Sequence, residues 1–302
     1  MREEQITVCG NRKSVLKIYD DVKSPKGVML VIHGMQEHSG RYVGFAKKMN
    51  SKGYIIATSD LRGHGDNMVI SRPGYSDGNI FEEIVLDQKE FIKFLKREYS
   101  KLPLFVLGHS FGSFIAQRLL TESDNLVDKF VLCGSAYTKN IKFTLGGVVA
   151  KLTQEFKGRG ADAKLVEKLS LKGYGKKFDN GNWLSRDEKV FEDYKNDVLC
   201  GLTFPASFYV SMFTSAKNNY KNLAVVDEST PIFIIAGTMD PVGDYTKSVK
   251  KLIKVYKHHW LNVYFKFYEG ARHELLNETN KEEVIKDIVE FLGADNKKAN
   301  MR

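Results

Sequence analysis

The sequence predicts an α/β fold in which a mainly parallel sheet carries helices on both faces. Short apolar runs alternate with longer amphipathic segments along the 302 residues, a pattern typical of repeated strand–helix units. The runs contain few polar residues, as expected of strands that are buried on both faces of a sheet. Hydrophobic residues make up 42% of the chain and charged residues 27%, values that exclude a disordered or fibrous protein.

Each expected strand is one of these apolar runs, and most of the runs end in a loop that contains glycine. Residues 5–19 are interpreted as a hairpin around Gly10-Asn11. The other expected strands are Val28–Ile32, Tyr54–Thr58, Leu104–Leu107, Lys129–Cys133, Pro231–Ala236 and Val263–Tyr268. Helical periodicity predicts helices over Phe81–Glu98, Phe114–Thr121, Tyr245–Lys257 and Lys281–Leu292.

An insertion interrupts this alternation. Nearly a hundred residues separate the strand that ends near Gly134 from the one that starts at Pro231, whereas a strand–helix–strand unit needs only about thirty. Residues 137–205 contain helix-like stretches broken by glycines, and we interpret them as a helical cap over the edge of the sheet. The expected organisation is a core formed by residues 1–136 and 206–302, with the cap between them.

The sharpest local pattern is G-x-S-x-G at Gly108–Gly112, with Ser110 at its centre. It follows an expected strand and precedes an expected helix, which is the setting of a serine nucleophile. The tight turn strains the serine backbone and leaves no room for side chains at the flanking positions, which explains Gly108 and Gly112. Ser110 is therefore the candidate nucleophile, and an incidental serine in a tight turn is the alternative.

A serine hydroxyl needs a base to accept its proton and an acid to orient that base. Among the seven histidines, His273 follows the last expected strand, and α/β folds place their sites at the carboxyl ends of strands. Asp240 lies just past Pro231–Ala236 and gives the chain order Ser…Asp…His. Asp244 is a rival for the acid, but we expect it to cap the helix that begins at Tyr245.

The oxyanion that forms during acyl transfer needs backbone donors. One expected donor is the amide of Phe111, directly after the candidate nucleophile. The second is expected from the loop His33-Gly34-Met35-Gln36, which follows the strand Val28–Ile32. Gly34 allows this loop to turn tightly, which leaves the Met35 amide as the second donor and its side chain free to line the acyl pocket.

Together these motifs resemble the α/β-hydrolase superfamily, and within it the monoacylglycerol lipase and lysophospholipase-like group of the serine aminopeptidase S33 type. The segments that carry the resemblance are His33–Tyr42, Asp60–Gly65, Gly108–Gly112, Asp240–Val242 and Gly270–His273, in the family's order. The resemblance implies an eight-stranded sheet, a cap after the sixth strand, no cofactor, and a serine hydrolase that cleaves carboxylic esters of lipid-like acyl chains.

The same resemblance implies a triad of Ser110, Asp240 and His273, with Met35 and Phe111 as oxyanion donors. One position departs from the family's pattern, because Gln36 stands where lipases of this group usually have glycine. A change at this point of the loop affects the oxyanion site or the mouth of the acyl pocket. The resemblance therefore does not carry over a specificity for monoacylglycerol.

Two other functions share parts of this pattern. A peptidase of the prolyl-aminopeptidase type has the same fold and triad but needs pocket acids to hold an ammonium group, for which Asp187 and Glu188 are cap candidates. A non-catalytic scaffold typically loses triad members, and this chain has all three. A metal site has no support, because His273–Asn277 departs from H-E-x-x-H at its last position and no C-x-x-C pair occurs.

The net charge of +9 raises the question of an anionic partner. Nucleic acid is not expected, because the motifs leave no element that would recognise it. Residues 151–177 carry eight Lys or Arg against three Asp or Glu, interleaved with apolar residues. This basic cap is suited to contact anionic lipid, although lysines that simply face water explain the same pattern. No signal peptide or membrane span is apparent, so we expect a cytoplasmic protein, peripheral to the membrane at most.

Overall fold

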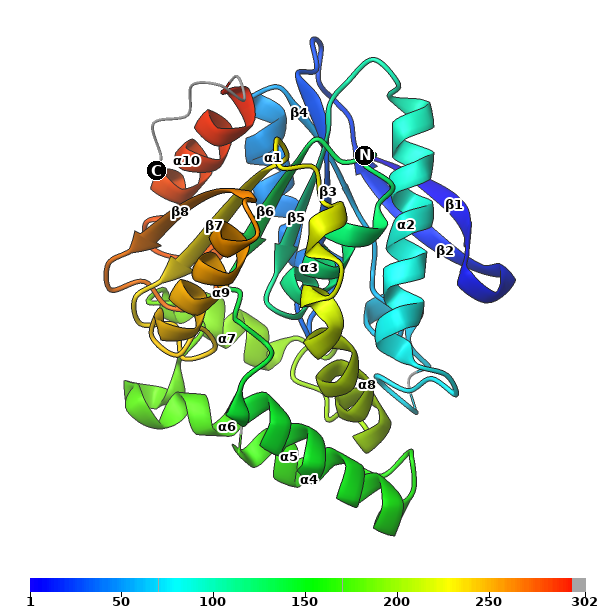
Figure 1. The fold of residues 1–302 in the computed structure, drawn as a ribbon, viewed down its shortest axis with the longest axis vertical. Helices are drawn as coiled ribbons and strands as arrows, with labels where there is room; N and C mark the ends of the chain where they lie inside the picture. Colours follow the sequence, from blue (N-terminus) through cyan, green and yellow to red (C-terminus); the bar gives the residue numbers. More distant parts are fainter. Residues whose placement is uncertain (70, 170, 295–302) are drawn as a thin grey trace.

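A single sheet organises the molecule. The computed structural model describes residues 1–69, 71–169 and 171–294, and within them it contains an eight-stranded sheet in the order β1-β2-β4-β3-β5-β6-β7-β8 (Figure 1). β2 pairs antiparallel with both of its neighbours, and all other neighbouring pairs are parallel. The strands are β1 (Arg2–Val8), β2 (Arg12–Tyr19), β3 (Gly27–Ile32), β4 (Tyr54–Thr58), β5 (Leu104–His109), β6 (Lys129–Cys133), β7 (Pro231–Gly237) and β8 (Asn262–Tyr268). The predicted α/β class and mostly parallel sheet are confirmed.

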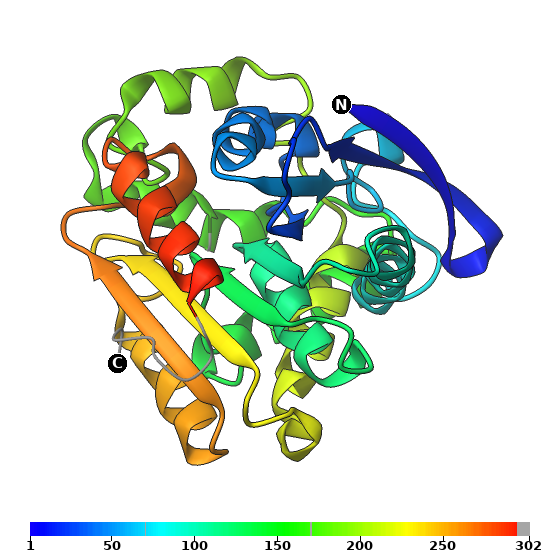
Figure 2. The same cartoon turned by 90° about the horizontal axis from the view of Figure 1, so that it is seen from above.

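Helices cover both faces of this sheet, as Figure 2 shows from above. One face carries α1 (Val43–Ser51) and α10 (Lys281–Gly293). The other face carries α2 (Ile80–Glu98), α3 (Phe111–Glu122), α8 (Ala206–Ala216) and α9 (Lys247–His258). Strands β3 to β7 are buried along their whole length. Burial on both faces explains why their sequences are continuous apolar runs rather than alternating ones.

Helix α2 shows how local sequence fixes the ends of an element. The side chain of Asn79 precedes the helix and accepts a hydrogen bond from the Glu82 amide at 3.3 Å. Glu82 and Glu83 lie in the first turn, and Lys96 and Arg97 lie in the last. These charges complement the positive amino end and the negative carboxyl end of the helix dipole.

Helix α9 begins later than expected, at Lys247 rather than Tyr245. Asp244, Tyr245 and Thr246 all adopt left-handed backbone conformations, with φ values of 51°, 52° and 73°, so the helix cannot include them. The expectation that Asp244 caps this helix is wrong. The residue that precedes the helix is Thr246, and Asp244 Oδ1 instead accepts a hydrogen bond from Lys142 Nζ at 2.7 Å.

The segment between β6 and α8 forms a separate group of helices. They are α4 (Ile141–Lys157), α5 (Lys164–Leu169), α6 (Leu171–Tyr174) and α7 (Glu188–Asn196). Figure 1 shows α4, α5 and α6 below the sheet. α4 packs along α8, where the rings of Phe143 and Phe213 lie 5.1 Å apart. In the described part of the chain, no helix has both the length and the apolar character needed to cross a membrane.

Replacing Phe233 by alanine tests the core between β7 and α10. The Phe233 side chain is fully buried, and its ring lies 5.1 Å from that of Phe291. We expect the Phe233→Ala variant to lose about 3–5 kcal/mol of unfolding free energy, because a cavity replaces the ring. Urea unfolding measures this loss. The matched control is Phe156→Ala, at a side chain that is 84% exposed, with an expected change of about 0.5 kcal/mol or less. Equal losses in the two variants would contradict this core.

Candidate active site

Ser110 occupies the sharp turn between β5 and α3. Its backbone is left-handed, with φ 52° and ψ −118°, a conformation that L-residues rarely adopt. A side chain at position 108 would collide with the backbone of Gly112, and one at position 112 would collide with the backbone carbonyl of Ile32. The G-x-S-x-G pattern is therefore required by the close approach of α3 to β3 and β5. Strand β5 continues to His109, and helix α3 begins at Phe111, so nothing but the serine lies between them.

His273 and Asp240 form a buried pair next to this turn. His273 Nδ1 lies 2.9 Å from Asp240 Oδ2, and both side chains are inaccessible to solvent. The second carboxylate oxygen of Asp240 accepts a hydrogen bond from the Val242 amide at 2.8 Å. Burial lowers the pKa of His273, but the Asp240 charge and hydrogen bond outweigh it, so that the pKa lies above its usual value.

Two further rings enclose the His273 imidazole. The centroid of His109 lies 4.8 Å from that of His273, and the centroid of Trp183 lies 5.1 Å from it on a ring tilted by 35°. Burial, with the neighbouring His273, lowers the pKa of His109 to about 4, so His109 is neutral at pH 7. The His273 ring is therefore confined between two uncharged aromatic groups.

The loop after β3 approaches Ser110 closely. A Cβ at Gly34 would lie 3.2 Å from the Cβ of Ser110. His33 is completely buried and holds this loop, since its Nε2 accepts a hydrogen bond from the Leu61 amide at 2.9 Å and its Nδ1 donates to Gly34 O at 2.8 Å. The Gly34 amide in turn donates to Glu37 Oε1 at 2.5 Å. The structure thus brings the predicted loop residues His33, Gly34 and Met35 to the predicted nucleophile.

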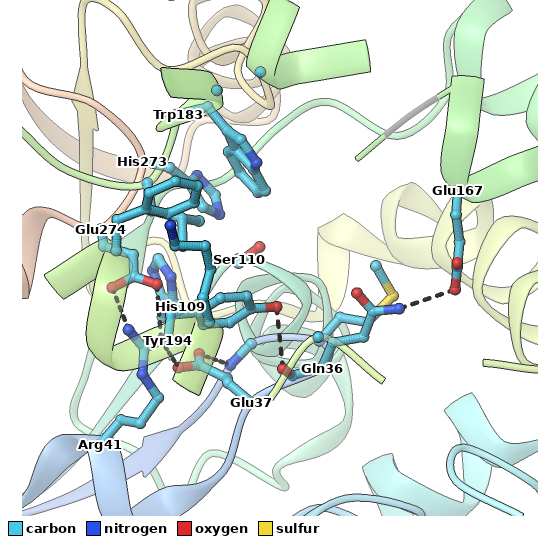
Figure 3. A pocket seen from close by; sticks show the side chains of 18 of the residues that line it. Gln36, Glu37, Arg41, His109, Ser110, Glu167, Trp183, Tyr194, His273 and Glu274 are labelled. Atoms are coloured by element: carbon cyan, nitrogen blue, oxygen red, sulfur yellow. Dashed lines mark hydrogen bonds and ion pairs between the residues drawn. The ribbon is translucent and has the colours of Figure 1, made fainter. Parts of the chain in front are cut away.

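A cavity of about 660 Å³ opens above Ser110 (Figure 3). Ser110, His273, Gly34 and Met35 line it from the core, whereas Asp240 lies behind His273 and outside the lining. Other walls come from the segment between β6 and α8, and they include Glu167, Trp183, Leu184, Phe191 and Tyr194. Local sequence patterns do not mark these residues as cavity residues, because they approach the serine only through the folding of the inserted helices.

A buried charge cluster that sequence reasoning missed lies at the cavity wall. Arg41 Nη1 contacts Glu37 Oε2 at 2.7 Å, and its guanidinium binds both carboxylate oxygens of Glu274 at 2.7 and 2.8 Å. The Tyr42 hydroxyl donates to Glu37 at 2.9 Å. Burial raises the pKa of Glu37, but Arg41, the neighbouring histidines and the Gly34 amide together outweigh this effect and bring the pKa to about 2. The i,i+4 spacing of Glu37 and Arg41 is the one trace of this cluster in the sequence.

Asp187 and Glu188, the cap acids considered for an ammonium ligand, do not line the cavity. Asp187 Oδ1 accepts a hydrogen bond from the Lys189 amide at the start of α7, and Glu188 is exposed. The acids that line the cavity are Glu37, Glu167 and Glu274.

One group of side chains in the described residues has metal-binding chemistry. The donor atoms of His38, Asp197 and Cys200 lie within 4.8 Å of one another. His38 Nε2 is hydrogen-bonded to Asp197 Oδ2 at 2.8 Å, and His38 Nδ1 accepts from the Gly40 amide at 3.2 Å. Both ring nitrogens of His38 therefore have protein partners. Burial raises the pKa of the Cys200 thiol, which favours its protonated form.

Similar proteins support an ester-hydrolase relationship. A monoglyceride lipase homolog of monkeypox virus is 26% identical over 278 residues, which cover 90% of this chain and 91% of that protein. The monoglyceride lipase of Homo sapiens is 26% identical over 268 residues, which cover 84% of this chain and 78% of that protein. The structure of a thermostable carboxyl esterase from Bacillus coagulans, in complex with glycerol, has a TM-score of 0.85 and 27% identity over 96% of this chain and 97% of that one.

A family comparison covers most of the chain. The profile of the serine aminopeptidase S33 family matches residues 23–280. These residues include the sharp turn at Ser110, the loop after β3 and the His273–Asp240 pair. The chain therefore belongs to the serine aminopeptidase S33 family of α/β-hydrolases.

Proposed function

We propose that the protein is a serine hydrolase that cleaves carboxylic esters through an acyl-enzyme on Ser110. One observation carries this proposal: Ser110, with its left-handed backbone conformation, and His273 line the same cavity. Asp240 is buried behind His273 and hydrogen-bonded to it. The arrangement supplies a nucleophile, a base and a group that orients the base. The names of the similar proteins, monoglyceride lipases and a carboxyl esterase, support an acyl ester as the substrate.

In the proposed reaction His273 Nε2 accepts the proton of Ser110 as the serine attacks the acyl carbonyl. The hydrogen bond from His273 Nδ1 to Asp240 keeps Nε2 free for this role and stabilises the imidazolium. The alcohol then leaves with the proton from His273. A water molecule repeats the sequence and releases the acid.

The proposed oxyanion donors are the amides of Met35 and Phe111. Within the described residues neither amide has a hydrogen-bond partner, although the neighbouring Gly34 amide is bound to Glu37. Phe111 is the first residue of α3, so its amide adds the positive end of the helix dipole. An unpaired amide directly after the serine, and a second on a loop that lines the same cavity, suit a developing negative charge.

We propose that residues 137–205 act as a cap on a core formed by residues 1–136 and 206–302. This proposal is supported by the cavity walls that α5, α7 and the loop around Trp183 supply. The walls Trp183, Leu184 and Phe191 are apolar, which favours substrates with a lipid-like part of monoacylglycerol or lysophospholipid type. A peptidase of the prolyl-aminopeptidase type is the second candidate, since Glu167 gives this cavity an acid on the cap.

We also propose that the cap rests on anionic lipid. Helix α4 has an exposed apolar face, formed by Ile141, Leu145, Val148, Leu152 and Phe156, whose side chains are 47–84% exposed. Their spacing of three and four residues places them along one side of the helix. The lysines of this segment add the charge that an anionic surface attracts.

Ser110→Ala tests the nucleophile. We expect labelling by a fluorophosphonate probe to disappear and kcat for a p-nitrophenyl ester to fall by about 10⁶-fold. The reason is that the variant has no hydroxyl at the turn between β5 and α3. Ser51→Ala, at an exposed serine of α1, is the control and retains both signals. Labelling of Ser110→Ala at the wild-type level would refute the acyl-enzyme. Comparison of p-nitrophenyl esters with aminoacyl anilides separates the esterase from the peptidase.

The His273–Asp240 pair predicts the pH dependence. A general base acts in its neutral form, so kcat/KM falls as the pH drops through the His273 pKa. Because Asp240 raises that pKa, we expect the acid limb of the profile to have its midpoint above about 6.5. Asp240→Asn removes the charge, so its midpoint moves to lower pH and its kcat falls by about 10⁴-fold. An unmoved midpoint in Asp240→Asn would show that another group sets the profile.

Sedimentation with vesicles tests the lipid contact. We expect wild-type protein to bind vesicles that contain phosphatidylserine more strongly than vesicles of phosphatidylcholine alone. The double variant Leu145→Ser, Phe156→Ser removes two side chains of the apolar face and lowers binding to both. Trp260→Ser, at a side chain that is 79% exposed outside the cap, is the matched control. No preference for anionic vesicles would exclude the role of the basic cap.

A further inference from the structure

A short segment of the insertion is bound to the loop that carries His273. This segment, residues 182–186, is called the strap below. The His273 amide donates a hydrogen bond to the Trp183 carbonyl at 3.4 Å, and the Glu274 amide donates to the Leu184 carbonyl at 2.7 Å. Because both acceptors are main-chain oxygens, these contacts do not depend on which side chains the strap carries.

Arg272 and Asn182 add further hydrogen bonds to the strap. Arg272 Nη1 donates to the carbonyls of Asn182 and Ser185, the second at 3.0 Å and the first at 2.6 Å. The buried side chain of Asn182 accepts hydrogen bonds from the amides of Leu184 and Ser185, both at 3.2 Å. The strap is therefore folded back on itself and also fixed to the residue that precedes His273.

Glu278 connects the strap to the same loop a second time. Its side chain is fully buried. Oε1 accepts hydrogen bonds from the amides of Arg272 at 2.8 Å and Arg186 at 3.1 Å, and Oε2 accepts from Arg186 Nε at 3.0 Å. Separating the strap from the loop would leave this carboxylate buried without its cation, which is costly. The strap is thus held against the loop of His273.

Trp183 is the residue of the strap whose ring contacts the His273 imidazole. The two ring centroids lie 5.1 Å apart, and the ring planes are tilted by 35° (Figure 3). Tyr174 packs edge-on against the indole, with centroids 5.3 Å apart and an angle of 64°. The indole is therefore fixed beside the imidazole by its own main chain and by a second aromatic ring.

The charged groups near His273 show what the indole adds. Asp240 is the carboxylate that is hydrogen-bonded to the imidazole. Glu274 and Glu37 also favour its charged form, although both are bound to Arg41. A positive charge that forms on His273 is thus attracted from the Asp240 side, along the plane of the ring, and the indole lies on another side.

The remaining titratable groups around the pair contribute no negative charge at pH 7. His109 is neutral, because burial and the neighbouring His273 lower its pKa to about 4. Tyr174 is neutral as well, because burial raises its pKa. Lys176 and Lys195 line the same cavity, but both are exposed to solvent. An aromatic face is therefore the favourable partner that the insertion offers to a charged imidazole.

We propose that Trp183 is a positioning residue for the base: its indole orients the His273 ring and stabilises the imidazolium that forms when Ser110 gives up its proton. The inference rests on the proposed acyl-enzyme at Ser110. Aromatic faces attract cations within about 6 Å of the ring centroid, and indole does so most strongly. Neutral imidazole gains less from this contact, so the indole favours the state that follows proton transfer. The strap then contributes to the reaction as well as to the cavity wall.

Two replacements of Trp183 test this role. Trp183→Phe and Trp183→Leu leave gaps of similar size, but only phenylalanine keeps an aromatic face. In profiles of kcat/KM against pH for p-nitrophenyl butyrate, we expect the acid-limb midpoint of Trp183→Leu to lie about half a pH unit below that of Trp183→Phe. The kcat of Trp183→Leu is expected to be about threefold lower than that of Trp183→Phe. NMR titration of the His273 ring protons measures the same difference directly.

A purely structural role for Trp183 predicts a different result. It lowers kcat at every pH and leaves the two variants with one midpoint, so equal midpoints, or a higher midpoint in Trp183→Leu, would overturn the inference. Phe191→Leu is the matched control, because it removes another aromatic side chain from the cavity wall. Its midpoint is expected to equal that of the wild type, and a shift as large as that of Trp183→Leu would contradict a specific role of Trp183.

Urea unfolding shows whether each variant is folded. If Trp183→Leu does not fold, Trp183→Met takes its place, since methionine also lacks a ring and adapts to irregular gaps. If the wild type cleaves the ester and the two variants share one midpoint, the hydrolase proposal stands and only the role of Trp183 fails. If the wild type cleaves no ester and the fluorophosphonate does not label Ser110, both proposals fail.

Discussion

The close packing of α3 against the centre of the sheet is the constraint on which the site depends. Gly112 lies against the backbone carbonyl of Ile32, and Gly108 lies against the backbone of Gly112, with no space for a methyl group. This contact forces the chain to turn within one residue, and Ser110 takes the left-handed conformation that results. The packing of the surrounding core holds the Ser110 backbone in this strained conformation, since β5 and the start of α3 are fully buried. The loop after β3 then meets the serine because its own strand neighbours β5.

Local sequence patterns were sufficient to predict the sheet and the position of the sharp turn at Ser110. Continuous apolar runs mark the buried strands, and β4 and β6 begin and end where the sequence indicates. The start of α9 could not be predicted, because three consecutive residues with positive φ have no signature in their side chains. Asp240 and His273 were found because each directly follows a strand, and the structure brings them to 2.9 Å from one another. Glu167 and Trp183 were missed, since only the tertiary fold of the insertion carries them to the cavity.

The acids at the cavity wall fall into two arrangements, one paired with a cation and one bound by neutral donors. Glu37 and Glu274 enclose Arg41 and act as a rigid polar wall, because each charge has a partner at hydrogen-bond distance. Glu167 is satisfied on one oxygen by three neutral donors from the core loop, α8 and the chain before it. The first arrangement holds the loop beside the serine, and the second ties Gln36 of that loop to Glu167 of α5. The Gln36 contacts also make the geometry of that loop dependent on the inserted helices.

The buried histidines around the serine affect how the fold tolerates acid. Burial lowers the pKa of His33, brings that of His64 to about 3 and brings that of His109 to about 4. The unfolded chain binds protons at these positions below about pH 6.5, whereas the folded chain does not, so each group removes stability as the pH falls toward its folded pKa. In that range each such group costs about 1.4 kcal/mol per pH unit. The packing that keeps these rings neutral thus makes the fold less stable as the medium becomes more acidic.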